Sequence, residues 1–300
     1  MSGNPPAPAR LSYAAVTPAR DEEVNLARLS ESLLAQTLRP TRWVIVENGS
    51  SDGTAALAQQ LAARHDWISL VQAEPGDRYD RTSPYMRAWH RGVEALGGAG
   101  DLVVKLDADV SMGPDYFAGI VAAFERDPTL GIASGTLFEQ RRGDWEEIVL
   151  LGDHVWGPTR TYRRACLEVV LPLDDGIGYA SIDEAKAHLA GFRTATLGNL
   201  PFRHHRPEGA GEGSRWKSWS EQGVAAHYTG YRFSYLAARS LYRAVRDPAS
   251  LGLLTGYLGA ALRRAPRYDD PEVIAALRRT QRARNLAMIV RARIQRPGPA

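Results

Sequence analysis

Two aspartates separated by a single alanine, Asp107 and Asp109, follow an apolar segment that runs from Leu102 to Leu106. Two carboxylates this close repel each other unless a cation lies beside them, and Mg²⁺ or Mn²⁺ prefers such oxygens together with phosphate oxygens and water. A solvated surface turn is the alternative, because Asp-x-Asp is common in loops. The position directly after an apolar segment favours a divalent metal site for a phosphate-bearing ligand.

A second group of chemically capable residues lies in the short segment from Leu200 to Pro207, which holds two histidines and two arginines. Histidine can complete a metal shell, and cationic side chains can neutralise a departing anion. We predict His205 as a metal ligand and give His204 the smaller role. A solvated polar loop is the alternative.

The first half of the chain alternates segments typical of strands and helices, and these must position the acidic pair. Strands are predicted at 13–16, 43–46, 68–71 and 102–106, and helices from about residue 22, from about residue 54 and at 85–96. Apolar strands separated by helices predict an α/β fold, Rossmann-like, with a mostly parallel sheet covered by helices on both faces. Ligands bind such sheets at the carboxyl ends of the strands, where the polar segments 18–23, 47–50 and 107–109 follow the predicted strands.

These segments resemble the family 2 glycosyltransferases, whose fold is called GT-A. Residues 18–23, Pro-Ala-Arg-Asp-Glu-Glu, are similar to the family's opening motif, and residues 46–54 are similar to its Val-Asp-Asp-Gly-Ser-x-Asp-Gly-Thr motif. Leu106 to Asp109, followed by Pro114 and Asp115, is similar to its metal motif. The resemblance covers about Ser12 to Pro207.

The resemblance implies which residues contact a nucleotide-sugar donor and its metal ion. The implied donor-binding residues are Pro18, Ala19, Arg20, Glu22, Glu47, Asn48, Ser50 and Asp107. The implied ligands of Mg²⁺ or Mn²⁺ are Asp107 and Asp109. Glu47 and Asn48 depart from the family's two adjacent aspartates, which leaves the nucleobase open.

Transfer of a sugar to a hydroxyl also needs a general base. Residues 179–184, ahead of Gly191, resemble the family's acidic helix start, and this alignment places Asp183 in the base position with Glu184 as the alternative. A carboxylate that only caps a helix or interacts with its dipole is the simpler interpretation of the same residues.

The 300 residues suffice for one large domain with an appendage. We predict a disordered leader at 1–10, a catalytic domain at 11–207 and a helical, basic C-terminal region at 208–300. Cys166 is the single cysteine, which suits a reducing compartment. With neither a signal peptide nor a spanning segment expected, the predicted location is the cytoplasm.

The charge is unevenly distributed along the chain. Residues 1–202 carry 19 Lys and Arg against 27 Asp and Glu, whereas residues 203–300 carry 18 against 7. A basic region with leucine and aromatic residues predicts peripheral contact with the inner face of the cell membrane, or a helical appendage packed on the catalytic domain or on a second subunit. We expect no nucleic-acid partner.

Together these features predict a metal-dependent, inverting glycosyltransferase that moves one sugar to a saccharide or lipid-linked acceptor during assembly of cell-envelope polysaccharide or glycolipid. Two alternatives stay open at this point. One is a sugar-1-phosphate nucleotidylyltransferase, although its glycine-rich loop is missing after the first strand. The other is a non-catalytic module that binds a nucleotide or a membrane on the same fold.

Overall fold

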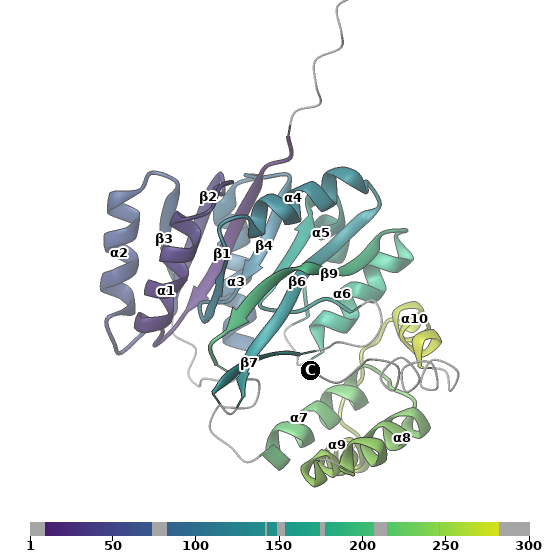
Figure 1. Cartoon of the computed structure of the whole chain (residues 1–300). Helices are drawn as coiled ribbons and strands as arrows, with labels where there is room; N and C mark the ends of the chain where they lie inside the picture. The colour runs from purple at the N-terminus through teal and green to yellow at the C-terminus, as the bar shows by residue number, and fades with distance from the viewer. Residues whose placement is uncertain are drawn as a thin grey trace, which may run out of the picture.

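The computed structural model describes residues 10–73, 83–141, 143–148, 154–174, 178–206, 215–245 and 247–281. Its centre is a nine-stranded sheet with the order β3-β2-β1-β4-β8-β6-β9-β5, in which β7 also pairs with β6 (Figure 1). The strands are β1 (Tyr13–Ala19), β2 (Arg42–Glu47), β3 (Ile68–Gln72), β4 (Leu102–Leu106), β5 (Val110–Met112), β6 (Leu130–Arg141), β7 (Asp144–Glu147), β8 (Thr159–Arg163) and β9 (Arg193–His204).

Strands β3, β2, β1 and β4 form the parallel half of the sheet, as the sequence predicts. Alternate residues of β1 enter different cores: Tyr13 and Ala15 pack on one face, Ala14 and Val16 on the other. Helices cover both faces, which confirms the predicted layering. The helices before residue 207 are α1 (Glu23–Leu34), α2 (Thr54–Arg64), α3 (Ser83–Leu96), α4 (Tyr116–Arg126), α5 (Arg164–Val170) and α6 (Tyr179–Leu189).

The other half of the sheet is mixed, because β8 runs antiparallel to β4 and to β6, and β5 runs antiparallel to β9. The register of the last pair sets Val110 opposite His204. Residues that are nearly a hundred positions apart in the sequence therefore lie side by side next to Asp109.

The C-terminal region is helical, with α7 (Arg215–Tyr228), α8 (Phe233–Ala244), the 3₁₀ turn η1 (Pro248–Leu251), α9 (Gly252–Leu262) and α10 (Pro271–Thr280). Helices α7 and α9 approach backbone to backbone: a Cβ atom at Gly256 would lie 1.9 Å from the carbonyl oxygen of Ser220, and one at Gly223 would lie 2.2 Å from that of Leu253. Only glycine permits this spacing.

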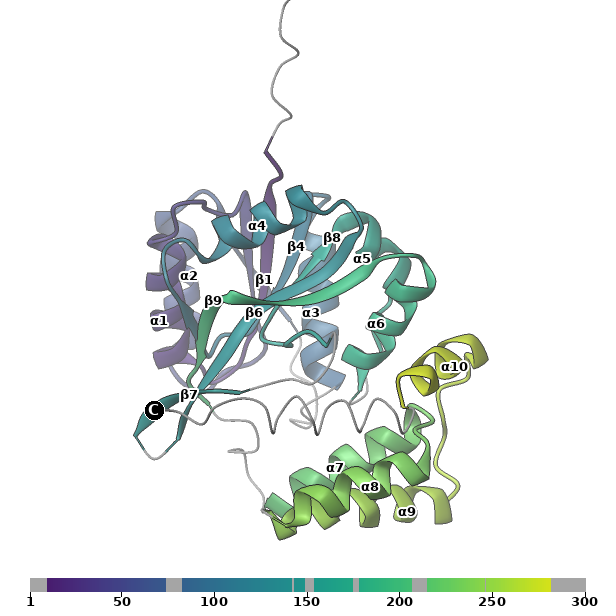
Figure 2. The ribbon, with the colours of Figure 1, turned by 45° about the vertical axis from the view of Figure 1, so that its right-hand side comes forward.

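Helices α7, α8 and α9 lie beyond the carboxyl ends of the parallel strands in both views of the ribbon (Figures 1 and 2). Helix α10 packs instead on α6, where Val273 and Leu277 join Ile182 and Ala185 in a small core. Among the described residues, no helix has the length and apolar character needed to cross a membrane. The predicted leader, apart from Arg10, and the predicted boundary at 207/208 lie outside the described residues.

Candidate active site at the carboxyl edge of the sheet

The loops that follow β1 and β2 are tied to each other by hydrogen bonds. Asp21, held in the left-handed region at φ 53°, accepts from the backbone N–H of Ser51 at 2.7 Å, and its own N–H donates to the hydroxyl of Ser50 at 3.1 Å. The N–H of Glu22 donates to the hydroxyl of Thr54 at 2.8 Å. The two family-like segments thus form one surface.

The structure places most of the predicted donor-binding residues on this surface. Pro18 and Ala19 are buried at the end of β1, opposite Val46 and Glu47, so they can meet a ligand chiefly through their backbone. A carboxylate oxygen of Glu47 accepts from the N–H of Ser50 at 2.5 Å, so this oxygen stabilises the turn after β2. Contact of these residues with a donor stays a prediction, as it does for the half-buried Arg20 and the buried Asn48.

Asp107 lies beside a buried lysine that the sequence analysis left without a role. Lys105, only 2% exposed, places its Nζ 2.6 Å from Oδ1 of Asp107, and the hydroxyl of Tyr85 donates to the same oxygen. Burial acts to lower the pKa of Lys105, but Asp107 and Tyr179 together outweigh it and hold that pKa above its ordinary value. The lysine therefore stays charged next to the predicted metal ligand.

Asp109 lies among cations contributed by the end of β9. Its Oδ1 is 3.4 Å from Nε2 of His204, and its Oδ2 is 3.9 Å from Nε of Arg206, whose Nη2 pairs with Glu22 at 2.7 Å. Burial acts to lower the pKa of His204, yet its hydrogen bonds to Asp109 and Glu139 raise it to about 10. His204 and Arg206 thus form a cationic side to the acidic cluster.

His205, the predicted metal ligand, lies next to this cluster and not inside it. Its Nε2 is 2.7 Å from the hydroxyl of Ser111, and its ring packs edge-on against Trp145 at 5.2 Å. It reaches Asp109 through its backbone, where its N–H donates to the carbonyl of Asp109 at 2.8 Å. Because neighbours on a strand face opposite ways, His204 is the histidine that turns toward the Asp109 carboxylate.

The two aspartates can accommodate a divalent cation through the chemistry of their oxygens. Both contacts to Asp109 are longer than ordinary short hydrogen bonds, and the partners of Asp107 share a single oxygen, Oδ1. Carboxylate oxygens of this kind suit Mg²⁺ or Mn²⁺ when phosphate oxygens complete the shell. The described residues contain no group of three or more histidine, cysteine, aspartate or glutamate side chains arranged to hold a metal.

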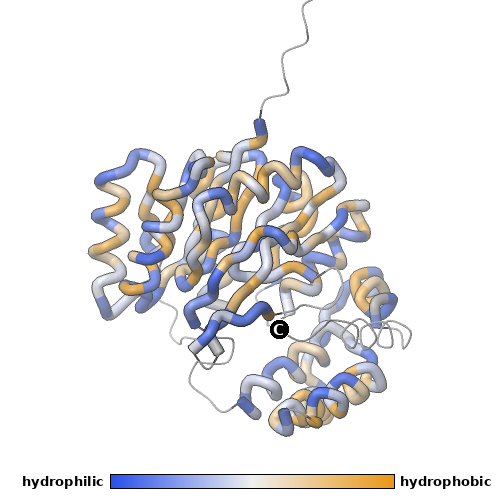
Figure 3. The backbone as a smooth tube through the Cα atoms, viewed as in Figure 1, coloured by the Kyte–Doolittle hydropathy of each residue, from blue (hydrophilic) through white to orange (hydrophobic). Residues whose placement is uncertain are grey.

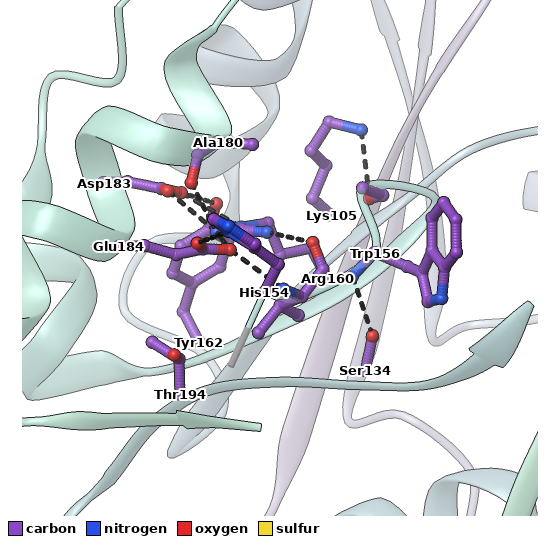
Figure 4. A network of polar contacts seen from close by, with 12 residues as sticks. Lys105, Ser134, His154, Trp156, Arg160, Tyr162, Ala180, Asp183, Glu184 and Thr194 are labelled. Carbon is purple, nitrogen blue, oxygen red and sulfur yellow. Dashed lines mark hydrogen bonds and ion pairs between the residues drawn. The ribbon is translucent and has the colours of Figure 1, made fainter. Parts of the chain in front are cut away.

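Asp183, the predicted base, and Glu184 are both buried around one guanidinium (Figure 4). Arg160 donates from Nη2 to Asp183 at 2.8 Å and to Glu184 at 2.9 Å, and the hydroxyl of Tyr162 donates to Asp183 at 2.6 Å. Burial raises the pKa of Asp183 to about 6, against the opposing effect of Arg160. Asp183 is 1% exposed, so this geometry disfavours direct contact with an acceptor. Its role as a base stays a prediction.

A short segment from His154 to Pro158 connects this buried group to Asp107. The N–H of Val155 donates to Glu184 at 2.9 Å, and the N–H of Asp107 donates to the carbonyl of Pro158 at 2.9 Å. Nδ1 of His154 lies 2.7 Å from Glu184. The half-exposed His154 side chain is therefore the point at which the buried network meets the surface (Figure 4).

Sequence reasoning gave no individual role to four residues of this site: Lys105, His154, Arg160 and Arg206. A charged residue within an apolar strand, two positions before an aspartate, is a signal for Lys105, because residues i and i+2 share a face of a strand. Arg160 had a comparable signal in its strand position. Arg206 lies in the segment from Leu200 to Pro207 that was singled out for its cations, but its pairing with Glu22 and Asp109 depends on the fold. His154 had no signal, because its partner Glu184 lies 30 positions away in the sequence.

Comparison with family models matches residues 14–171 to the family described as glycosyl transferase family 2. A comparison with curated protein sequences gives no match. Among solved structures, the mannosyltransferase PcManGT from Pyrobaculum calidifontis, in complex with GDP-Man and Mn²⁺, is 16% identical with a TM-score of 0.58, over 94% of this chain and 84% of that one.

Two further structures are similar. S. aureus TarS 1-349 is 16% identical with a TM-score of 0.54, over 95% of this chain and 92% of that one. GalNAc-T7, with UDP, GalNAc and Mn²⁺, is 13% identical with a TM-score of 0.58, over 87% of this chain and 56% of that one. These likenesses show that the fold is GT-A. The family model matches more than half of the residues of this chain, so the chain belongs to glycosyl transferase family 2.

Proposed function

We propose that this protein transfers one sugar from a nucleotide diphosphate donor to an acceptor hydroxyl, with inversion at the anomeric carbon. The observation that carries the proposal is the pairing of Asp107 with Lys105 and of Asp109 with His204 and Arg206, at the edge where the family-like loops converge. Balanced positive and negative side chains suit a diphosphate that arrives with a divalent cation.

In this reaction the acceptor oxygen bonds to the anomeric carbon while the bond from that carbon to the diphosphate breaks. The electron pair leaves with the nucleoside diphosphate, and the acceptor proton passes to a base. Arg206 lies where it can stabilise negative charge on the diphosphate as it departs, and the buried Lys105 adds positive charge from behind Asp107.

Asp107 and Asp109 would hold Mg²⁺ or Mn²⁺ in this proposal, with His205 as the further predicted ligand. The bound cation would supply positive charge beside the leaving diphosphate. Two of the similar structures are described with Mn²⁺, which supports a divalent cation here. The donor nucleotides in similar structures are GDP-Man and UDP-GlcNAc, and both belong in a first screen.

The acceptor in this proposal is a saccharide or a lipid-linked saccharide in the assembly of cell-envelope polysaccharide or glycolipid. The location is the cytoplasm, at the inner face of the membrane. Support comes from the exposed apolar residues at the ends of α8 and α9: Val245, directly after α8, is 86% exposed, and Leu262 of α9 is 85% exposed. Arg263 and Arg264 are exposed next to Leu262, a combination that suits an anionic lipid surface. Figure 3 shows hydrophobic and hydrophilic colours together in the region of α8 and α9, and α9 itself contains no charged residue.

The test of donor binding is a thermal-shift screen of nucleoside diphosphates and nucleotide sugars, each with Mn²⁺, with Mg²⁺ and with chelator. A ligand that binds the folded state raises its melting temperature. We expect one nucleotide to give a metal-dependent shift and its sugar conjugate to release nucleotide slowly in water. Folded protein without any nucleotide-dependent shift would contradict the proposal and support a non-catalytic module. Pyrophosphate release from a nucleoside triphosphate and a sugar phosphate would instead indicate a nucleotidylyltransferase.

The test of membrane contact is sedimentation with phosphatidylcholine vesicles, with and without phosphatidylglycerol. We expect binding to the anionic vesicles only, weakened by salt and by Leu258→Glu with Leu262→Glu. The matched control is Val169→Glu with Leu189→Glu, which adds the same two negative charges at exposed apolar residues of α5 and α6. Equal sedimentation of all three proteins would contradict membrane contact through α9.

A further inference from the structure

The reaction proposed above needs a base whose lone pair can touch the acceptor hydroxyl. Asp183 and Glu184 are nearly inaccessible, at 1% and 5% exposed. Their carboxylate oxygens are already engaged: Glu184 accepts from Val155 and Arg160 and contacts His154, and Asp183 accepts from Arg160 and Tyr162. These carboxylates are arranged to act on a neighbouring side chain.

That neighbour is His154, whose side chain is 44% exposed while its Nδ1 lies 2.7 Å from Oε2 of Glu184. Since a carboxylate accepts, the contact fixes the tautomer in which Nδ1 carries the proton and Nε2 carries the lone pair. The backbone is fixed as well, because the carbonyl of His154 accepts from the hydroxyl of Thr196 at 2.7 Å. Glu184 thus orients the ring, as Figure 4 shows, while Thr196 holds the backbone that carries it.

The position of His154 suits the reaction. Gly157 lies three positions after His154 in the chain, so their Cα atoms lie within about 11 Å of each other. The carbonyl of Gly157 accepts from Nζ of Lys105 at 3.3 Å, and Lys105 pairs with Asp107. A sugar attached to a diphosphate at Asp107 would therefore lie within reach of this segment.

The charges around His154 also favour uptake of a proton. Two carboxylates share one guanidinium at Arg160, which leaves an excess negative charge beneath the imidazole. The hydrogen bond to Glu184 raises the pKa of His154, while burial, Arg160 and, from α8, Arg239 act to lower it. The net direction is upward, so the ring gains basicity from the buried pair.

We infer that His154 is the general base for the acceptor hydroxyl, with Glu184 and Asp183 as the residues that position it and Arg160 as the residue that holds them together. Nε2 takes the acceptor proton as the acceptor oxygen bonds to the anomeric carbon and the diphosphate leaves. This inference rests on the proposed function.

The decisive experiment compares His154→Gln with the wild-type protein. Nucleotide release from GDP-mannose and from UDP-GlcNAc is measured with Mn²⁺, water being the acceptor, beside the thermal shift with GDP and UDP. General-base assistance contributes roughly 10² to 10⁴ in rate, so we expect a loss of at least about 10²-fold with an unchanged thermal shift. His188→Gln on α6 is the matched control and retains the wild-type rate.

Two further measurements separate a base from a structural residue. Imidazole added to His154→Ala restores part of the lost rate, and gives no increase with the wild type. Glu184→Gln moves the acidic limb of the wild-type pH-rate profile to lower pH, because the imidazole loses the carboxylate that raises its pKa.

The inference is overturned if His154→Gln releases nucleotide at the wild-type rate. The same holds if Asp183→Asn loses all activity while His154→Gln loses none.

If wild-type protein shows neither a nucleotide-dependent shift nor nucleotide release, the proposed function fails and the inference is withdrawn with it.

Discussion

Two acidic pairs in this protein have opposite surroundings. Asp107 and Asp109 follow a strand at the sheet edge, and each has its own cationic partners, Lys105 for the first and His204 with Arg206 for the second. Asp183 and Glu184 are likewise two acidic residues close together in the sequence, yet they are buried and share Arg160. The two pairs differ in how deeply they are buried and in how many cations surround them. These differences make the first pair accessible to a ligand and restrict the second pair to acting through another side chain.

The largest expected effect tests the buried pair. Arg160→Met leaves two buried carboxylates without their guanidinium, and removing one partner of a buried ion pair costs about 3–5 kcal/mol. Urea unfolding measures the loss. The control is Arg193→Met, whose pair with Asp127 is exposed and contributes less than about 1 kcal/mol. Similar stability of the two variants would show that the buried group is not held as described.

The next effect is a pH dependence of stability at Asp183, whose pKa rises on burial from 3.8 to about 6. Between these values the folded protein holds a proton that the unfolded chain has lost, so stability from this group falls as pH rises from about 4 through about 6. The difference in unfolding free energy between wild type and Asp183→Asn should decline over that window by about 3 kcal/mol at most. A difference that is flat with pH would contradict the raised pKa.

Asp107→Asn tests the edge pair through ligand binding. With the carboxylate charge gone, we expect the Mn²⁺-dependent thermal shift to disappear and nucleotide release to fall by at least about 10²-fold, or about 2.7 kcal/mol. Stability without ligand should fall as well, because the buried Lys105 loses the carboxylate beside it, so binding is measured under conditions where both proteins are folded. Asp66→Asn, at an exposed residue before β3, is the control that keeps the metal-dependent shift and the rate of nucleotide release. An unchanged metal-dependent shift in Asp107→Asn would remove Asp107 from the metal site.

The smallest effect concerns the loops that present the edge pair. Thr54→Val removes the hydroxyl that accepts from the N–H of Glu22, and an unsatisfied buried donor costs about 1–3 kcal/mol. We expect a loss at the lower end of this range, with weaker nucleotide binding because the loop after β1 loosens. Thr129→Val, at an exposed threonine bonded to Asp127, is the matched control. Loss of stability without any change in binding would show that the loop does not form part of the donor site.

Local pattern was sufficient to predict the parallel strands, the first helices and the polar segments at the sheet edge. Each depends on residues close together in the sequence, such as the apolar run from Leu102 to Leu106 that ends at Asp107. The mixed half of the sheet was not predictable in this way. The pairing of Val110 with His204 depends on a register between distant strands, and no local period encodes it.

The same limit applies to the site. The sequence identifies Asp183 as an acidic residue near a helix start, but its access to a ligand depends on Arg160 and Tyr162, which come from β8. His154 is chemically unremarkable in the sequence until Glu184 is placed behind it. Roles that depend on burial and orientation require the assembled fold.

The glycine contacts between α7 and α9 make the orientation of α9 independent of the side chains that α9 exposes. Because backbones meet at Gly223 and Gly256, the direction in which α9 faces is set by main-chain contact. The exposed residues Leu258 and Leu262 take no part in that contact, so they can change without reorienting the helix. Related chains can therefore diverge in what this surface recognises while they preserve how it is presented, and an engineer could exchange its outer residues independently of its geometry.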